Sequence, residues 1–224
     1  MTILKINNTI IKAIVFDYNG TLAKLNIDFH KMRQSVLELI ASYDVSPNDL
    51  PADHILETIH HAAEIVRVNT DSKADSLITN AYELIRQQEI AAACQGELFE
   101  QTRYLLSRLD AAGIATAVIT RNCLAAINIE FPDISSYCRA VICRDHVTQV
   151  KPHPEHLNKA LQMLGIKAAN SLMVGDHPLD IKTGKAVGTF TAGVLTGNSR
   201  KEDFRQVQAD LVLSCAADLL DLAE

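Results

Sequence analysis

The segment IVFDYNGTL, residues 14–22, sets the interpretation of this chain. Its first three residues are apolar and belong to a longer run at 11–17, which is typical of a short strand buried on both faces of a parallel sheet. The run ends in Asp17, and the glycine and hydroxyl residue that follow favour a turn. The sequence therefore predicts a carboxylate presented at the end of a buried strand.

Four more apolar runs resemble the first one and predict further strands. They lie at 114–120, 140–143, 171–175 and 190–194. Between them are amphipathic helical stretches at 98–112, 154–164 and 178–187, each closed by a glycine suited to a helix C-cap: Gly113, Gly165 and Gly188. Alternating strands and helices predict an α/β fold, a doubly wound, Rossmann-like parallel sheet.

The region between the first two strands breaks this alternation. Residues 25–95 carry helical periodicity and no convincing strand. We expect helices at 29–42, 52–67 and 73–93, with breaks at 46–48 and 69–72. The chain is therefore expected to form an α/β core from residues 1–24 and 96–224, with residues 25–95 inserted as a small α-helical domain.

Composition excludes several classes of function. The 224 residues carry a net charge of −6 without a basic cluster, which argues against binding nucleic acid. No apolar run approaches the ~18 residues of a membrane span, and the first twelve residues lack a secretory signal pattern. The five cysteines are scattered and show no paired CxxC spacing. We expect a cytoplasmic monomer or homodimer, with reduced thiols and a small-molecule partner.

Residues with carboxylate, hydroxyl or amine side chains follow four of the predicted strands. Asp17 ends the first strand, and Thr120 ends the second, followed by Arg121 and Asn122; Asn122 has an alternative interpretation as a helix N-cap. Lys151 lies in an extended VKPHP loop, and MVGDHPLD places Asp176 at a strand end with Asp180 four residues on. Open parallel sheets bind ligands at the carboxyl ends of their strands, so these residues are candidates for one site. Clustered carboxylates there suit Mg²⁺.

These four features, in this order, resemble the motifs of the haloacid dehalogenase-like hydrolase superfamily. The GTL opening, the helical insertion and the KPHP and VGDHPLDI segments are most similar to its phosphoglycolate phosphatase-like members. The resemblance implies a Mg²⁺-dependent phosphatase for a small phosphorylated metabolite, in which Asp17 forms an aspartyl-phosphate. It implies metal binding by Asp17, the Asn19 backbone carbonyl and Asp176, with support from Asp180.

The resemblance also implies how a substrate is held. Thr120 and Lys151 bind the transferring phosphoryl group, and Arg121 and Asn122 are further candidates for gripping phosphate. Metal and ammonium charge neutralise the phosphoryl oxygens while Asp17 is held in line with the breaking bond. The insertion at 25–95 stands where the family has its helical cap, so it is expected to close over the site and exclude water.

Asn19 departs from the family pattern, which has an aspartate acting as acid and base at this position. An amide cannot transfer a proton, and loss of acid–base catalysis typically lowers rates by about 10² to 10⁴. Three interpretations stay open. The protein is a slow or specialised phosphatase, for example one for acyl phosphates or one with an acid from the cap such as His60 or His61. Alternatively, Asn19 replaces a native aspartate, or the protein is a catalytically silent binder of metal and phosphate.

Another reaction of the same superfamily remains as an alternative. Phosphonate hydrolases use a lysine from the cap as a Schiff base, and Lys24 and Lys31 keep that function possible. Dehalogenases work without Mg²⁺ and usually lack the GDxxxD arrangement that this chain shows from Gly175 to Asp180, so they fit less well.

Overall fold

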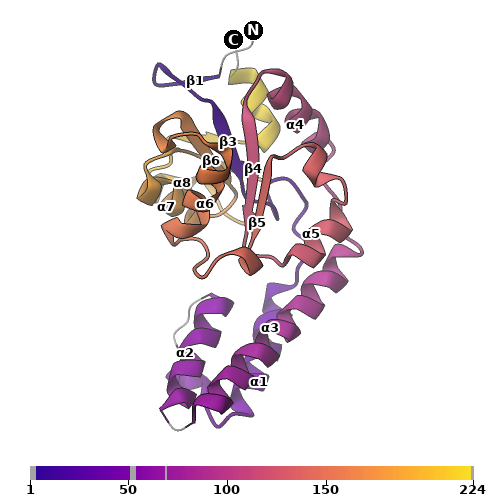
Figure 1. Ribbon diagram of the computed structural model, residues 1–224, viewed down its shortest axis with the longest axis vertical. Coiled ribbons are helices and arrows are strands. Elements are labelled where there is room, and N and C mark those ends of the chain that lie inside the picture. The colour runs from indigo at the N-terminus through magenta and orange to yellow at the C-terminus, as the bar shows by residue number, and fades with distance from the viewer. Residues whose placement is uncertain (1–3, 51–53, 69, 223–224) are drawn as a thin grey trace. The chain divides into compact units, whose positions relative to one another are not determined.

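A computed structural model describes residues 4–50, 54–68 and 70–222 of the chain (Figure 1). The chain divides into two compact units, one formed by residues 1–26 and 93–224 and the other by residues 27–92. The first unit is an α/β sandwich and the second is helical. Each unit is described below by itself.

A six-stranded parallel sheet forms the centre of the α/β unit. Its order is β5-β4-β3-β6-β7-β8, and every neighbouring pair is parallel. The strands are β3 (Ala13–Phe16), β4 (Ala115–Thr120), β5 (Ala140–Cys143), β6 (Ser171–Gly175), β7 (Phe190–Val194) and β8 (Leu211–Leu213). The predicted parallel α/β fold is confirmed. β8 and a short antiparallel hairpin, β1 (Lys5–Ile6) with β2 (Thr9–Ile10), were not predicted.

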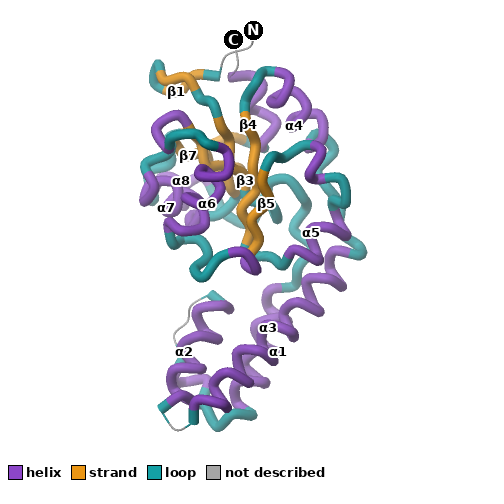
Figure 2. Tube along the Cα trace, in the orientation of Figure 1, coloured by secondary structure: helices purple, strands orange, loops and turns teal. Residues whose placement is uncertain are grey.

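Helices cover both faces of this sheet, as Figures 1 and 2 show. Successive strand residues point to opposite faces. Ile14 and Phe16 of β3 pack into one apolar cluster with α4 (Thr102–Ala111), whereas Ala13 and Val15 pack into another with α6 (Pro154–Leu164). Both faces of β3 are therefore buried, which explains its continuous apolar run.

The remaining helices of this unit are α5 (Leu124–Glu130), α7 (Pro178–Val187) and α8 (Lys201–Gln206). α6 and α7 end as predicted, because Gly165 and Gly188 adopt φ values of +66° and +84° at their C-caps. α4 begins at Thr102, later than the predicted 98, since residues 98–101 form a bridge and turn first. Across the described ranges, no helix is both long and apolar enough to cross a membrane.

The helical unit contains α1 (Phe29–Ala41), α2 (Ile55–Arg67) and most of α3 (Asp71–Ala93). A short 3-10 turn at Pro47–Asp49 coincides with the predicted break. The second predicted break is wrong at Asp71 and Ser72, which already belong to α3; Asn69 and the predicted helix start at 52–53 lie outside the described residues. Each helix buries one apolar stripe, with Val36, Ile59 and Leu77 among its members.

Candidate active site

Three neighbouring strands end in residues that the sequence analysis selected. Asp17 follows β3, Thr120 ends β4 and Asp176 follows β6. Because β4, β3 and β6 are parallel neighbours, their carboxyl ends meet at one edge of the sheet. The candidate site lies at this edge.

A buried ammonium group between two carboxylates forms the centre of the site. Lys151 Nζ lies 2.8 Å from Asp17 Oδ1 and 2.7 Å from Asp180 Oδ1. The side chains of Lys151 and Asp180 are almost fully buried, whereas Asp17 keeps 15% of its side chain exposed. The Tyr18 backbone N–H also donates to Asp17 Oδ1, at 2.6 Å. In the part of the chain that the structure describes, Asp17 Oδ2 has no hydrogen-bond partner, so this oxygen can meet a ligand.

Asp176 completes a group of three carboxylates. Oxygen atoms of Asp17, Asp176 and Asp180 all lie within 4.8 Å of one another. Burial raises the pKa values of Asp176 and Asp180, and neighbouring carboxylate charge raises them further, against the influence of Lys151. For Lys151, burial alone would lower the pKa, but Asp17 and Asp180 outweigh it and the pKa is raised. One ammonium group thus faces three carboxylates, and this excess of negative charge fits a divalent cation with a preference for oxygen ligands.

Two glycines, Gly20 and Gly197, lie directly against the Asp176 carboxylate. Gly20 has a φ of +82°, and a Cβ added there would overlap the Asp176 carboxylate. A Cβ at Gly197, in the loop after β7, would overlap the same group. The Thr21 hydroxyl donates to Asp176 Oδ1 at 3.3 Å. The Gly20-Thr21 pair in the sequence is thus explained by close approach to a carboxylate.

The loop after β7 is a part of the site that the sequence analysis missed. The Thr196 hydroxyl donates to the Gly20 carbonyl at 2.5 Å, which joins this loop to the turn after Asp17. The signal was present, because Thr196-Gly197 at a strand end combines a hydroxyl and a glycine as Gly20-Thr21 does. The pair carries no ionisable group, so it does not stand out as a candidate for chemistry in the sequence.

Asp180 is held in place by the start of α7. The His177 backbone N–H donates to Asp180 Oδ2 at 3.1 Å, which leaves Oδ1 for the Lys151 ammonium. A Cβ at Gly175 would overlap the Asp180 carboxylate. The spacing from Gly175 to Asp180 therefore brings a helix-start carboxylate back against the strand end.

The turn after β4 presents a hydroxyl group. Asn122 N–H donates to the oxygen of the buried Thr120 hydroxyl at 3.1 Å, so the hydroxyl proton remains for another acceptor. The interpretation of Asn122 as the N-cap of α5 is wrong, because Cys123 holds that position; the Cys123 N–H donates to Asn122 Oδ1 at 2.8 Å. Arg121 Nη1 donates to the Lys151 carbonyl at 2.5 Å. Asn122 thus organises the turn, and Arg121 ties it to the lysine loop.

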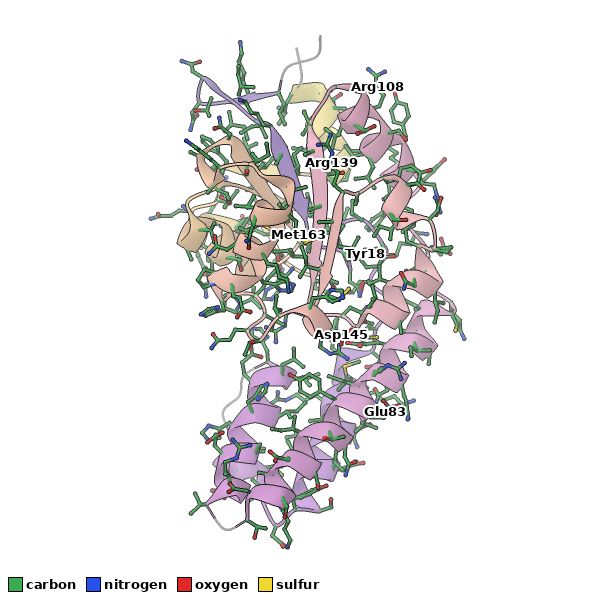
Figure 3. All side chains as sticks on the ribbon, viewed as in Figure 1. Tyr18, Glu83, Arg108, Arg139, Asp145 and Met163 are labelled. Carbon is green, nitrogen blue, oxygen red and sulfur yellow. The ribbon has the colours of Figure 1, made fainter. Side chains whose placement is uncertain are left out.

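A buried arginine behind this turn was also missed. Arg144 is 5% exposed; its N–H donates to the Asn122 carbonyl at 3.3 Å and its Nη1 to the Arg121 carbonyl at 3.1 Å. Its neighbour Asp145, labelled in Figure 3, accepts a hydrogen bond from Leu124 N–H at 2.8 Å. An arginine after a short strand looks like an exposed loop residue in the sequence, so no pattern could have identified it.

Asn19 occupies the turn between Asp17 and Gly20. Its Oδ1 atom is buried and has no hydrogen-bond partner within the described ranges. A buried acceptor without a donor costs about 1–3 kcal/mol. The amide is therefore suited to accept a hydrogen bond from a ligand or from water, but it cannot supply a proton.

The other candidates from the sequence lie in different surroundings. Lys24 Nζ is ion-paired with Glu97 Oε2 at 2.6 Å on the surface of the α/β unit. Lys31 is exposed on α1. In the helical unit, His60 Nε2 lies 3.0 Å from the Tyr82 hydroxyl.

Comparison with known proteins relates this chain to a family of hydrolases. A family model described as haloacid dehalogenase-like hydrolase matches residues 14–194. A pyrophosphatase PpaX from Bacillus cereus is 29% identical over 218 residues, covering 95% of this chain and 96% of the relative. A similar pyrophosphatase PpaX from Anoxybacillus flavithermus is 28% identical over 214 residues, with the same coverage of both chains.

Solved structures share the fold at lower sequence identity. A hydrolase from Pseudomonas syringae superposes with a TM-score of 0.67 and 19% identity, covering 94% of this chain and 96% of its own. A protein from Haemophilus somnus described as a predicted phosphoglycolate phosphatase gives a TM-score of 0.64 and 17% identity, with 95% and 97% covered. At such identities the likeness concerns the fold alone.

Proposed function

The chain belongs to the haloacid dehalogenase-like hydrolase family, and on this basis we propose that it is a Mg²⁺-dependent phosphatase whose nucleophile is the Asp17 carboxylate. One observation carries the proposal. Asp17 is the partly exposed member of a buried group in which Lys151 Nζ lies 2.8 Å from its Oδ1, with Asp176 and Asp180 close by. This is an arrangement that can hold both a cation and a phosphoryl group.

Mg²⁺ is the cofactor that these residues fit. Asp17, the backbone carbonyl of Asn19 and Asp176 would hold it, and Asp180 would support the site while binding Lys151. All the candidate ligand atoms are carboxylate or carbonyl oxygens, which are hard ligands, and the three carboxylates carry more negative charge than the single Lys151 ammonium can balance. This favours Mg²⁺ over softer metals. When bound, the cation supplies positive charge against the oxygens of the transferring group.

The proposed reaction has two displacements at phosphorus. A carboxylate oxygen of Asp17 attacks the phosphorus atom, and the bond from phosphorus to the leaving oxygen breaks, with its electron pair staying on that oxygen. Water then attacks the aspartyl-phosphate, the bond to Asp17 breaks, and inorganic phosphate leaves. Lys151 and the Thr120 hydroxyl hold the phosphoryl oxygens during both steps, since both lie at the same sheet edge as Asp17.

The amide at Asn19 indicates which class of leaving group the site can release. With an amide next to the nucleophile, the leaving oxygen must depart without a proton from this position. Acyl phosphates and phosphoanhydrides release stable anions, whereas simple alkyl phosphates release alkoxides. The relatives named pyrophosphatase make a phosphoanhydride the first substrate to test. We propose a specialised phosphatase for such small phosphorylated metabolites, slow toward simple monoesters.

The helical unit is proposed to be the cap that the resemblance implies. Its separate compactness, over residues 27–92, supports an inserted domain. In the proposal, this cap covers the site during the reaction and excludes bulk water. We propose that it extends over residues 25–95. A cap residue such as His60 or His61 then has the opportunity to act as an acid.

The alternatives predict different results. A phosphonate hydrolase needs a free lysine amine for its Schiff base; Lys24 is ion-paired with Glu97 on the surface, and Lys31 is exposed on α1. Trapping of an aldehyde substrate by borohydride would establish this alternative. A catalytically silent binder would hold Mg²⁺ and phosphate without turnover. If Asn19 replaces a native aspartate, the substitution Asn19→Asp should restore the phosphatase activity.

The test is phosphate release from pyrophosphate, acetyl phosphate and a panel of small phosphomonoesters. It is run with Mg²⁺ and after chelation, on the wild type and on Asp17→Asn. We expect turnover of an anhydride or acyl phosphate that needs Mg²⁺ and disappears in Asp17→Asn. Binding of Mg²⁺ and inorganic phosphate with no turnover of any substrate would establish the silent binder instead.

A further inference from the structure

The loop between β5 and α6, which carries Lys151, is bound to side chains of α6. Glu155 accepts two backbone hydrogen bonds, from Thr148 N–H at Oε1 and from Gln149 N–H at Oε2, both at 3.0 Å. One turn further along the helix, Lys159 Nζ donates to the His146 carbonyl. The loop is therefore folded back onto the first two turns of α6.

His156 makes the contact with Lys151 itself. Its ring is fully buried; the Lys151 backbone N–H lies 3.3 Å from Nδ1, and Nε2 lies 2.9 Å from the carbonyl of Ile142 in β5. A backbone N–H can only donate and a carbonyl can only accept. Nδ1 therefore carries no proton and Nε2 carries one, so the contacts assign a neutral imidazole in one tautomer.

Both backbone polar groups of Lys151 are thus fixed by side chains. His156 accepts from its N–H, and Arg121 donates to its carbonyl at 2.5 Å. The ammonium stands at the end of a flexible four-carbon stem, so its place between Asp17 and Asp180 depends on where this backbone is held. Through Ile142, the ring also links the loop to the sheet.

We propose that His156 is a positioning residue, which fixes the Lys151 backbone so that the ammonium meets Asp17 and the phosphoryl group of the substrate. The part about substrate rests on the proposed function, while the hydrogen bonds of the ring do not. Protonation would turn Nδ1 into a second donor against the Lys151 N–H and break the contact. Burial, followed by the charge of Lys151, lowers the pKa of His156 to about 3, so the ring stays neutral at pH 7; Arg121 and His146 act in the same direction.

Two substitutions separate the two ends of the ring. Asn has an amide atom close to the place of Nδ1, so His156→Asn keeps an acceptor for Lys151 and loses the bond to Ile142. Gln reaches the place of Nε2, so His156→Gln keeps the bond to Ile142 and loses the acceptor for Lys151. Each variant loses one buried hydrogen bond, and we expect similar losses of stability.

Activity should nevertheless differ between the two variants. We expect kcat to fall by about tenfold to 10²-fold in His156→Gln and much less in His156→Asn, with the larger change in kcat and the smaller one in KM. His153→Asn is the matched control, since His153 only caps α6 through Glu155 N–H and should leave kcat unchanged. Equal losses of kcat in His156→Asn and His156→Gln would show a merely structural role and contradict the proposal.

A second measurement needs neither activity nor a variant. Nitrogen chemical shifts of histidine-labelled wild type report the tautomer, and a titration reports whether the ring protonates. The proposal requires a neutral Nε2–H ring for His156 down to pH 5, together with slow hydrogen exchange of the Lys151 amide. An Nδ1–H tautomer, or titration near the ordinary pKa of 6.5, overturns it. An inactive wild type that shows the required tautomer would instead reject the proposed function and keep the positioning contact.

Discussion

The backbone of Gly20 lies directly against the carboxylate of Asp176. A Cβ added to Gly20 would overlap the carboxylate, and the glycine adopts a φ of +82° that other residues rarely adopt. The turn after Asp17, the proposed nucleophile, and the strand end that carries a metal-binding candidate therefore fit against each other without space for a side chain. This relationship connects a glycine in the sequence to the proposed Mg²⁺ site.

Gly20→Ala should abolish most of the Mg²⁺ binding. The methyl group must displace the Asp176 carboxylate, so the rise of the unfolding temperature on adding Mg²⁺ should disappear, because bound ligand stabilises the native state. Gly113→Ala is the matched control: Gly113 has a φ of +76° but nothing within 4 Å of an added Cβ. In both variants, backbone strain should lower the free energy of unfolding by about 1 kcal/mol. Only Gly20→Ala should lose the rise of the unfolding temperature on adding Mg²⁺. An unchanged response in Gly20→Ala would show that Asp176 does not bind the cation.

Lys151→Met should affect both rate and stability. Removing the ammonium leaves the buried Asp180 and the partly exposed Asp17 without their partner, and breaking a buried pair such as Lys151–Asp180 typically costs about 3–5 kcal/mol. The same change removes a charge from the transition state, so kcat should fall by about 10² to 10³. Urea unfolding in Mg²⁺-free buffer and steady-state kinetics measure the two effects. Lys24→Met, which removes only an exposed ion pair with Glu97, should change neither measurably.

Glu130 should make the protein less stable as pH rises. Burial raises the pKa of this carboxyl from its ordinary value of 4.5 to about 7, partly opposed by the neighbouring hydroxyl of Tyr18, which Figure 3 labels. Between these two values the native state binds more protons than the unfolded state, so stability is lost as pH rises through 7. Glu130→Gln should therefore be more stable than the wild type at pH 8, and the difference should vanish below pH 4.5. Thermal unfolding of both proteins across this range gives the answer, and a constant difference would contradict the assignment.

Asn19→Asp should change the substrate range more than the overall activity. A carboxylic acid at this position can protonate a leaving alkoxide, so turnover of alkyl phosphates should rise by about 10² to 10⁴. Turnover of pyrophosphate or acetyl phosphate should change much less, since their leaving groups need no proton. Comparing kcat/KM across leaving groups of increasing basicity tests this. Equal gains for all substrates would mean that Asn19 limits some step other than departure of the leaving group.

Much of the fold could be predicted because it rests on local patterns. Five strands were predicted from apolar runs, and α6 and α7 have the predicted bounds because proline, glycine and amphipathic spacing mark both their ends. β8 was missed because its residues Leu211–Leu213 are only partly buried at the edge of the sheet, where no long apolar run is needed. The hairpin of β1 and β2 is too short to produce a clear alternation.

The site could be predicted where charged residues at strand ends belong to segments that resemble the family motifs, and not where residues act only through tertiary contacts. Asp17, Lys151 and Asp180 meet as their positions in the sequence implied. The roles of Gly197 and Arg144 depend on close approach between segments far apart in the chain; the Thr196-Gly197 pair at a strand end is a weak local signal, and Arg144 has none. Asn19 was recognised as a departure from the family pattern, but its buried, unpartnered Oδ1 is visible only in the structure.

Detection of the phosphoryl group on Asp17 tests the central claim most directly. The protein is mixed with Mg²⁺ and pyrophosphate or acetyl phosphate, quenched in acid within one turnover, digested and analysed by mass spectrometry, with Asp17→Asn treated in parallel. We predict one phosphoryl group on the peptide that contains Asp17, and none in Asp17→Asn. Release of phosphate with that peptide unmodified at every time, or modification that persists in Asp17→Asn, would contradict the assignment of Asp17 as the nucleophile.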